Sequence, residues 1–203
     1  MFNKYAERYE QQYMNVAMYH ESFDVFCNEV IENNATVLDV GCGPGNATKY
    51  LLNKRSDFTI TGIDLAPKMI TLAKKNNPTA NFKVFDGIQI KALNTTFNAI
   101  LAAFFLPYLN KSQTLNFIKN SADIIKTKGM LYLSTMEGKN SDSSLQSSSH
   151  NKADTIFINY HEAAYIKKSL QQNGFKLIYE DRKKYTHKNG TPTTDLILIA
   201  KKI

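Results

Sequence analysis

Residues 37–46 of this chain read VLDVGCGPGN. A short apolar run leads here into three alternate glycines, Gly41, Gly43 and Gly45, and then into a segment with helical character. Glycine lets the backbone turn sharply and lets a ligand lie against the main chain without a Cβ in the way. The amides that open the following helix favour a carboxylate or a phosphate. The segment therefore predicts a ligand-binding turn between a buried strand and a helix, although the glycines alone also fit an ordinary tight turn.

Acidic residues stand at the ends of the first three predicted strands. Asp39, inside the end of the first, suits a ligand with positive charge, such as the ammonium of an amino acid. Asp64 lies about twenty residues past the glycines and is placed to accept both hydroxyls of a ribose. The alternative for Asp64, a helix N-cap, is weaker because Ala66 is better placed as the cap. Asp86 is placed to accept a hydrogen bond from an adenine amine, or to serve as a turn residue before Gly87.

Strand-like and helix-like segments alternate through the first two thirds of the chain. This alternation implies right-handed crossovers and a parallel sheet. The predicted strands are 36–40, 59–63, 81–85, 99–103 and 130–135, and the predicted helices are 46–53, 67–76 and 112–126.

The ends of the chain have a different pattern. The first 33 residues predict one or two helices, since Tyr5, Tyr9 and Tyr13 recur every four residues. Residues 138–150 are rich in Ser and Asn and predict a mobile loop. A helix over about 161–173, ended by Gly174 as a cap, precedes two strand-like runs at 175–185 and 194–201. The Lys188-Asn189-Gly190 turn between these runs predicts an antiparallel hairpin.

Composition limits the class of protein. The 203 residues fit one α/β domain, and no apolar run approaches the roughly 20 residues of a membrane span. The N-terminus lacks the apolar core of a signal peptide, and Cys27 and Cys42 fit neither a disulfide framework nor a metal site, so a cytoplasmic protein without a metal is expected. The net charge of +7 comes from scattered lysines, which favours a solvated surface over nucleic-acid binding.

Five successive blocks resemble signature segments of the class I S-adenosylmethionine-dependent methyltransferases. They are VLDVGCGPGNATKYL, GIDLAPKMI, VFDG, FNAILAAFFLPYL and KTKGMLYLST, and the closing DLILIAKK is similar to that family's last strands. The resemblance implies a Rossmann-like α/β fold, a three-layer αβα sandwich whose seven-stranded, mostly parallel sheet has the order 3-2-1-4-5-7-6 and an antiparallel C-terminal hairpin. It implies a single domain over 1–203: a helical lid (1–33), a cofactor-binding core (36–136), a flexible loop (138–150), and a last helix with the hairpin (161–203).

The resemblance also implies S-adenosylmethionine as cofactor. Asp39 and the three glycines would line its methionine end, Asp64 would bind the ribose, and Asp86 with Gly87 would surround the adenine. Phe104 and Phe105 would wall the cavity beyond the fourth strand. The full set of implied cofactor-binding residues is Asp39, Gly41, Cys42, Gly43, Gly45, Asp64, Leu65, Asp86, Gly87, Ala102, Ala103 and Phe104, with Cys42 contributing backbone rather than a nucleophile.

Methyl transfer needs few catalytic groups from the protein. A sulfonium is already an activated leaving group, so alignment and exclusion of water carry much of the rate. A base is needed only if the acceptor must lose a proton. Tyr108 and His161 are the candidate catalytic residues on the acceptor side, with a packed aromatic and a helix-start histidine as their alternatives. Tyr9, Tyr13 and Tyr19 are candidates for a lid over the pocket, or for simple packing.

The predicted function is direct in-line transfer of a methyl group to a small-molecule acceptor, with release of S-adenosylhomocysteine, by a monomer or a homodimer. Residues 105–108 read FLPY, not the Asn/Asp-Pro-Pro-aromatic tetrad of enzymes that methylate exocyclic amines of nucleic-acid bases. Three alternatives stay open: methylation of RNA or protein, a non-catalytic S-adenosylmethionine-binding module, and a nicotinamide-dependent oxidoreductase, which the terminal hairpin disfavours.

Overall fold

The computed structural model describes residues 1–147, 153–186, 190 and 192–203. Its main feature is a seven-stranded sheet in the order β3-β2-β1-β4-β5-β9-β8. Strands β1 to β5 are parallel, and β9 runs antiparallel to both β5 and β8. The strands are β1 Thr36–Val40, β2 Thr59–Asp64, β3 Asn81–Val84, β4 Phe97–Ala102, β5 Ile125–Met136, β8 Phe175–Thr186 and β9 Pro192–Lys202. The predicted strand order and the antiparallel hairpin are confirmed.

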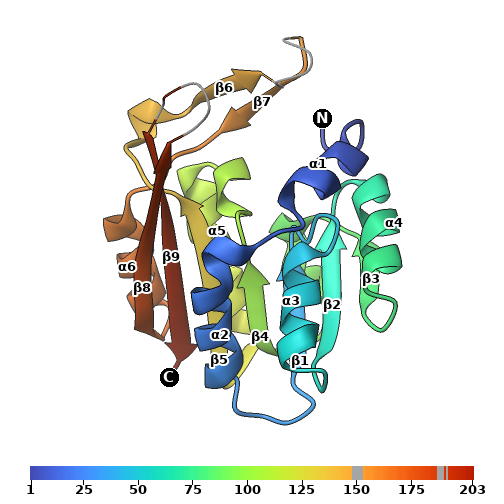
Figure 1. Ribbon diagram of the computed structural model, residues 1–203. Coiled ribbons are helices and arrows are strands. Elements are labelled where there is room, and N and C mark those ends of the chain that lie inside the picture. Colours follow the sequence, from blue (N-terminus) through green and yellow to red (C-terminus); the bar gives the residue numbers. More distant parts are fainter. Residues whose placement is uncertain (148–152, 187–189, 191) are drawn as a thin grey trace.

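Helices cover both faces of this sheet (Figure 1). Alternate residues of a strand point to opposite faces, so Val37 packs into one apolar core and Leu38 into the other. One face carries α2 (His20–Glu29) and α3 (Asn46–Lys54), with α4 (Pro67–Asn76) beside α3. The other carries α5 (Lys111–Ile124), α6 (Ala163–Gln172) and the 3-10 segment η2 (Gly87–Leu93). This is the predicted three-layer sandwich.

Local sequence explains where several helices begin and end. Pro67 occupies the first turn of α4, where its missing N–H costs nothing. Asn110 and Gln113 form a capping box at the start of α5, each side chain accepting the other's backbone N–H at 2.9 Å. Gly174, with φ of +76°, follows α6 in the left-handed conformation that favours glycine, as predicted for a cap.

Residues 138–150 were expected to form a flexible loop. Their described part, 138–147, contains regular structure instead. It contains the 3-10 turn η4 (Asn140–Asp142) and strand β6 (Ser144–Ser147), which pairs antiparallel with β7 (Thr155–Ile158). The physical reason is a cross-strand apolar pair, Leu145 opposite Phe157, which polar composition did not reveal. This small sheet stands above the carboxyl ends of the main strands (Figure 1). Most of the predicted Lys188-Asn189-Gly190 turn lies outside the described residues.

The N-terminal segment forms α1 (Ala6–Tyr13), the 3-10 turn η1 (Ala17–Tyr19) and α2, in agreement with the predicted helices. Side-chain hydrogen bonds attach α1 to the body of the domain. Asn76 Nδ2 donates to Glu10 at 2.6 Å, and Asn46 Nδ2 donates to the carbonyl of Tyr13 at 2.9 Å. The segment therefore crosses the end of the sheet at which β1 and β2 finish.

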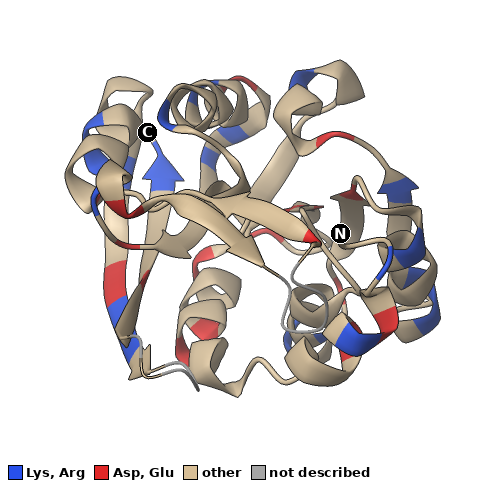
Figure 2. Cartoon of the chain, turned by 90° about the horizontal axis from the view of Figure 1, so that it is seen from above, with Lys and Arg blue, Asp and Glu red and all other residues tan. Residues whose placement is uncertain are grey.

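The charged residues that the structure describes are distributed over several elements. Figure 2, seen from above, shows Lys and Arg spread around the perimeter of the molecule on several helices and edge strands. None of the described helices is both long enough and apolar enough to cross a membrane.

Candidate functional site

The glycine loop after β1 adopts the conformation that its sequence predicts. Gly41, Gly43 and Gly45 have φ values of +69°, +53° and +81°, a region that L side chains rarely adopt. The backbone N–H groups of Gly41 and Cys42 both donate to the carbonyl of Ile63 in β2, at 2.8 and 3.0 Å. The loop is therefore a rigid, side-chain-poor surface at the carboxyl end of the sheet.

Two consecutive asparagines at the end of α4 hold the loop from behind. Asn76 Nδ2 donates to the carbonyl of Pro44, and Asn77 Nδ2 donates to that of Gly45, each at 2.9 Å. A Cβ added at Gly45 would lie 2.3 Å from Asn77 Nδ2, so only glycine fits there. Neither asparagine was among the predicted site residues, since their role depends on how α4 packs against the loop.

Asp64, at the end of β2, joins the glycine loop to the start of α4. Its Oδ2 accepts from the N–H of Gly43 at 3.0 Å, and its Oδ1 accepts from the N–H of Ala66 at 2.8 Å. Burial raises the pKa of Asp64 above its usual value, while the two backbone hydrogen bonds favour the charged form. Each carboxylate oxygen retains a second lone pair, so this side chain is able to accept ligand hydroxyls.

Asp39 lies behind the glycine loop and is 2% exposed. Its carboxylate accepts a hydrogen bond from Thr48 Oγ1 in α3 at 2.6 Å. Burial raises the pKa of Asp39 to about 7. The carboxyl group is therefore buried beneath the loop and is not part of the cavity lining.

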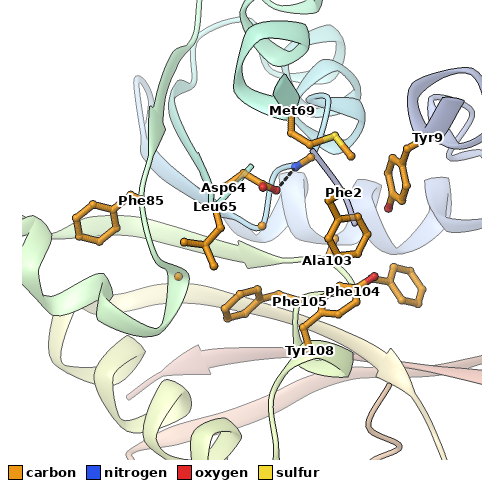
Figure 3. A pocket seen from close by; sticks show the side chains of 13 residues that line it. Phe2, Tyr9, Asp64, Leu65, Met69, Phe85, Ala103, Phe104, Phe105 and Tyr108 are labelled. Atoms are coloured by element: carbon orange, nitrogen blue, oxygen red, sulfur yellow. Dashed lines mark hydrogen bonds between the residues drawn. The ribbon is translucent and has the colours of Figure 1, made fainter. Parts of the chain in front are cut away.

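A cavity opens over the loop and the end of β2. Figure 3 shows aromatic and apolar side chains surrounding Asp64. The phenyl ring of Phe105 lies across the floor: a Cβ at Gly87 would be 2.6 Å from Phe105 Cζ, and one at Gly41 would be 3.1 Å from Phe105 Cδ2. The lining residues are Phe2, Tyr9, Gly41, Gly43, Asp64, Leu65, Met69, Phe85, Gly87, Ala103, Phe104, Phe105 and Tyr108. Of these, Phe2, Met69 and Phe85 were not among the predicted site residues.

A second cavity continues the first toward Met136 in β5 and Tyr185 in β8. The two share Tyr9, Gly41, Gly43, Ala103, Phe104 and Tyr108. The second is further lined by Tyr13, Asn15, Val16, Tyr19, Phe23, Cys42, Asn46, Ala47, Pro107, Met136 and Tyr185. We call this second cavity the aromatic chamber. Together they form one cleft, over which the predicted lid tyrosines Tyr9, Tyr13 and Tyr19 all lie.

Phe104 stands where the two cavities meet and has an unusual backbone conformation. Its φ is +54°, which is uncommon for a bulky residue. The conformation is held by its N–H, which donates to Ser134 Oγ in β5 at 2.9 Å, and by edge-on packing of its ring against Tyr19 at 5.1 Å. Strain of this kind is often found at functional sites.

The two predicted catalytic residues lie in different surroundings. Tyr108 is 38% exposed, lines both cavities and packs edge-on against Phe2 at 5.0 Å. His161 is 2% exposed, its Nε2 donates to the carbonyl of Leu106 at 2.9 Å, and its Nδ1 bonds with the hydroxyl of Tyr165. Burial lowers the pKa of His161. The His161 ring thus supports the turn that carries Tyr108. His161 itself is not among the residues that line either cavity.

The remaining predicted residues surround the cleft. Asp86 caps η2, its Oδ1 accepting from the N–H of Ile88 at 2.9 Å, which is the turn role considered for it. Leu65 is 66% exposed at the rim. Ala102 is buried at the end of β4, and the Cys42 side chain is buried under the loop. In the described part of the chain, no three His, Cys, Asp or Glu residues are grouped as metal ligands.

The residues of this cleft fit an adenosyl sulfonium. The glycine cradle leaves room for a ligand against the main chain, Asp64 offers oxygen atoms to hydroxyls, and Leu65, Phe85 and Phe105 offer apolar surface to a flat base. Asp64 is the acidic residue of the lining, and none of the described lining residues is Lys or Arg. A cationic ligand therefore suits the cleft better than a dinucleotide pyrophosphate.

Comparisons with known proteins agree with the cofactor that the cleft fits. The family model described as a methyltransferase domain matches residues 11–180. The chain is 35% identical to putative methyltransferase 235L of Invertebrate iridescent virus 6, over 51% of this chain and 38% of that protein. It spans between 35% and 52% of the length of the first curated relatives that it matches.

Two solved structures share the fold. A putative S-adenosylmethionine-dependent methyltransferase from Listeria monocytogenes superposes with a TM-score of 0.74 at 18% identity, covering 93% of this chain and 100% of that one. Magnesium protoporphyrin IX methyltransferase from Synechocystis PCC 6803, with bound S-adenosylmethionine, gives a TM-score of 0.68 at 17% identity, covering 92% of this chain and 81% of that one.

Proposed function

The chain belongs to the class I S-adenosylmethionine-dependent methyltransferases, and we propose that it transfers the methyl group of that cofactor to a small-molecule acceptor. The observation that carries the proposal is the continuous cleft. One end holds the glycine loop and Asp64, and the other is the aromatic chamber. A cleft of this form holds a cofactor and an acceptor side by side, with the transfer step at their junction beside Phe104.

We place the cofactor along the carboxyl ends of β1, β2 and β4. The loop between Gly41 and Gly45 would hold its amino-acid part, with the buried carboxyl of Asp39 beneath, and Asp64 would bind the ribose. Leu65, Phe85, Phe105 and Gly87 would surround the adenine. When bound, the cofactor supplies a methyl group on a positively charged sulfur, which is a good leaving group.

The protein's own contribution is positioning and exclusion of water. The rings of the chamber border the space next to Phe104, where they are placed to orient an acceptor and to exclude water once it is bound. Alignment of two reactants is able to supply roughly 7–11 kcal/mol of the barrier. Tyr108 borders both parts of the cleft and is placed to orient the acceptor through its hydroxyl. His161 acts through the position of the Leu106–Tyr108 turn.

Helix α1 with its preceding residues serves as the lid of this cleft. Phe2 and Tyr9 line the cavity over Asp64. The lid is fastened at its start by Lys4 Nζ and the Tyr5 hydroxyl, which donate to Asp154 ahead of β7 at 2.7 and 2.5 Å. At its other end the lid is held by Asn76 and Asn46, which donate to Glu10 and to the carbonyl of Tyr13, so opening of the lid would break these hydrogen bonds beside the glycine loop.

Calorimetry with S-adenosylmethionine, S-adenosylhomocysteine and NAD tests the cofactor assignment. The two adenosyl ligands should bind and NAD should not. A screen of metabolite extracts with methyl-labelled cofactor then tests transfer. Label recovered in a molecule of low mass supports the proposal, whereas label found only in RNA or protein contradicts the small-molecule acceptor.

A further inference from the structure

A buried carboxylate borders the aromatic chamber. Asp195 in β9 is 0% exposed, and its register partner in β5 is Met136, which lines the chamber. Cross-strand partners of an antiparallel pair project on the same face of the sheet. The Asp195 side chain therefore rises from the sheet next to the chamber wall.

Only one of the two oxygens of the Asp195 carboxylate has a hydrogen-bond donor. One oxygen accepts a hydrogen bond from the hydroxyl of Tyr19 at 2.7 Å, while Oδ1 is buried and has no partner among the residues that the structure describes. Lys183, opposite Asp195 in β8, directs its ammonium to Asp181 at 2.7 Å and to Glu21 at 3.2 Å. No described cation neutralises Asp195.

A buried carboxylate with one oxygen unpartnered and no counter-ion destabilises a fold unless a ligand donates to it or brings positive charge near it. Native proteins therefore rarely keep such a group without a role. The surrounding chamber residues include aromatic rings, among them Tyr13, Tyr185 and Phe104. The faces of aromatic rings attract cations. The side chains at this end of the cleft thus share a preference for positive charge.

We propose that the aromatic chamber takes an acceptor that carries an amine, with Tyr19 accepting an N–H hydrogen bond and Asp195 supplying the charge behind it. Tyr19 lines the chamber, and its hydroxyl has already given its proton to Asp195, so its oxygen presents lone pairs to a donor. Asp195 is a positioning residue, because it acts through Tyr19. The inference rests on the proposed methyltransferase function and names its substrate class.

Atoms and charges balance in N-methylation at this site. An acceptor that arrives as an ammonium first loses one proton to water. Its nitrogen lone pair then bonds to the methyl carbon while the carbon–sulfur bond breaks, its electron pair remaining on sulfur. The positive charge moves from sulfur to nitrogen in this step. A carboxylate near the nitrogen end favours that movement, because it stabilises charge that develops only in the transition state.

The test compares three probes of similar size and different charge: 2-phenylethylammonium, 3-phenylpropanol and 3-phenylpropionate. Binding to the full chain is measured by calorimetry at pH 7.5 with saturating S-adenosylhomocysteine. We expect the ammonium to bind at least tenfold more tightly than the carboxylate. Asp195→Asn should reduce this preference at least tenfold, and Tyr19→Phe, which retains the ring, should also reduce it. Asp123→Asn, which removes an exposed charge on α5, is the matched control and should leave the preference unchanged.

The outcomes separate the two proposals. An equal affinity for ammonium and carboxylate, or a preference that survives both Asp195→Asn and Tyr19→Phe, overturns the amine assignment while leaving methyl transfer intact. Failure of the unaltered protein to bind S-adenosylhomocysteine overturns the proposed function as well. Thermal unfolding of each variant shows whether it is folded, and Tyr19→Phe decides the matter if Asp195→Asn does not fold.

Discussion

The carboxylate of Asp64 binds the glycine loop directly, since its Oδ2 accepts a hydrogen bond from the backbone N–H of Gly43 at 3.0 Å. The same side chain holds Ala66 at the start of α4 through its other oxygen. An acid at the end of β2 thus sets the position of the loop after β1. One side chain organises the floor of the cleft and also offers it a hydrogen-bond acceptor.

Asp64→Asn should weaken S-adenosylmethionine binding at least tenfold. An amide has one acceptor oxygen, so it is unable to satisfy both backbone N–H groups and two ribose hydroxyls. Loss of one backbone hydrogen bond to a charged group should also cost about 1–3 kcal/mol of unfolding free energy. Calorimetry and urea unfolding measure the two effects. An unchanged affinity would show that the ribose does not lie at Asp64.

Asp39→Asn should change how stability depends on pH. Burial raises the pKa of Asp39 from 3.8 to about 7, so between these values the folded protein keeps a proton that the unfolded chain has lost. Stability therefore falls as pH rises through this window, by up to about 4 kcal/mol. Asparagine carries no charge and is still able to accept from Thr48. The loss of stability between pH 5 and pH 8 should be smaller in the variant than in the unaltered protein. Equal losses would mean that Asp39 does not titrate in this range.

Cys42→Ala should leave methyl transfer within about threefold of the unaltered protein. The side chain is buried under the loop, and burial raises the pKa of its thiol well above the usual value, so a thiolate nucleophile is not available at neutral pH. Formation of S-adenosylhomocysteine with the acceptor found by the extract screen gives the rate. A loss of a hundredfold or more would assign a chemical role to the thiol.

His161→Ala should destabilise the protein and leave the shape of the pH–rate profile unchanged. The substitution removes a buried ring and leaves the Leu106 carbonyl without its partner, at a cost of about 2–4 kcal/mol. Urea unfolding measures the loss. If instead the acidic limb of the profile disappeared, His161 would be acting as a general base.

Asp154→Ala should speed the release of bound S-adenosylhomocysteine severalfold. The substitution removes the acceptor to which Lys4 and Tyr5 donate, so α1 should open more often over the cavity. Stopped-flow displacement gives the dissociation rate, and Asp123→Ala controls for the loss of a surface charge. Equal rates in both variants would show that α1 does not limit release.

Sequence alone determined the fold and the floor of the cleft. Three glycines, an acid at the end of β2 and alternating apolar runs are local features with few conformations open to them, so their pattern predicts the loop and a parallel sheet directly. The same holds for the cap of α6 at Gly174 and for the terminal hairpin. The order of the strands followed from the resemblance of whole sequence blocks to a known family.

Only the tertiary structure decided what surrounds that floor. Tyr19 and Asp195 are 176 residues apart in the chain, and Asn76 meets Pro44 only because α4 packs against the glycine loop. Likewise, the burial that makes His161 a support for its neighbours comes from contacts with β4–α5 residues such as Leu106. Contacts of this kind depend on how whole elements pack, and no local sequence pattern predicts them. The residues on the acceptor side of the cleft could therefore be identified only from the tertiary structure.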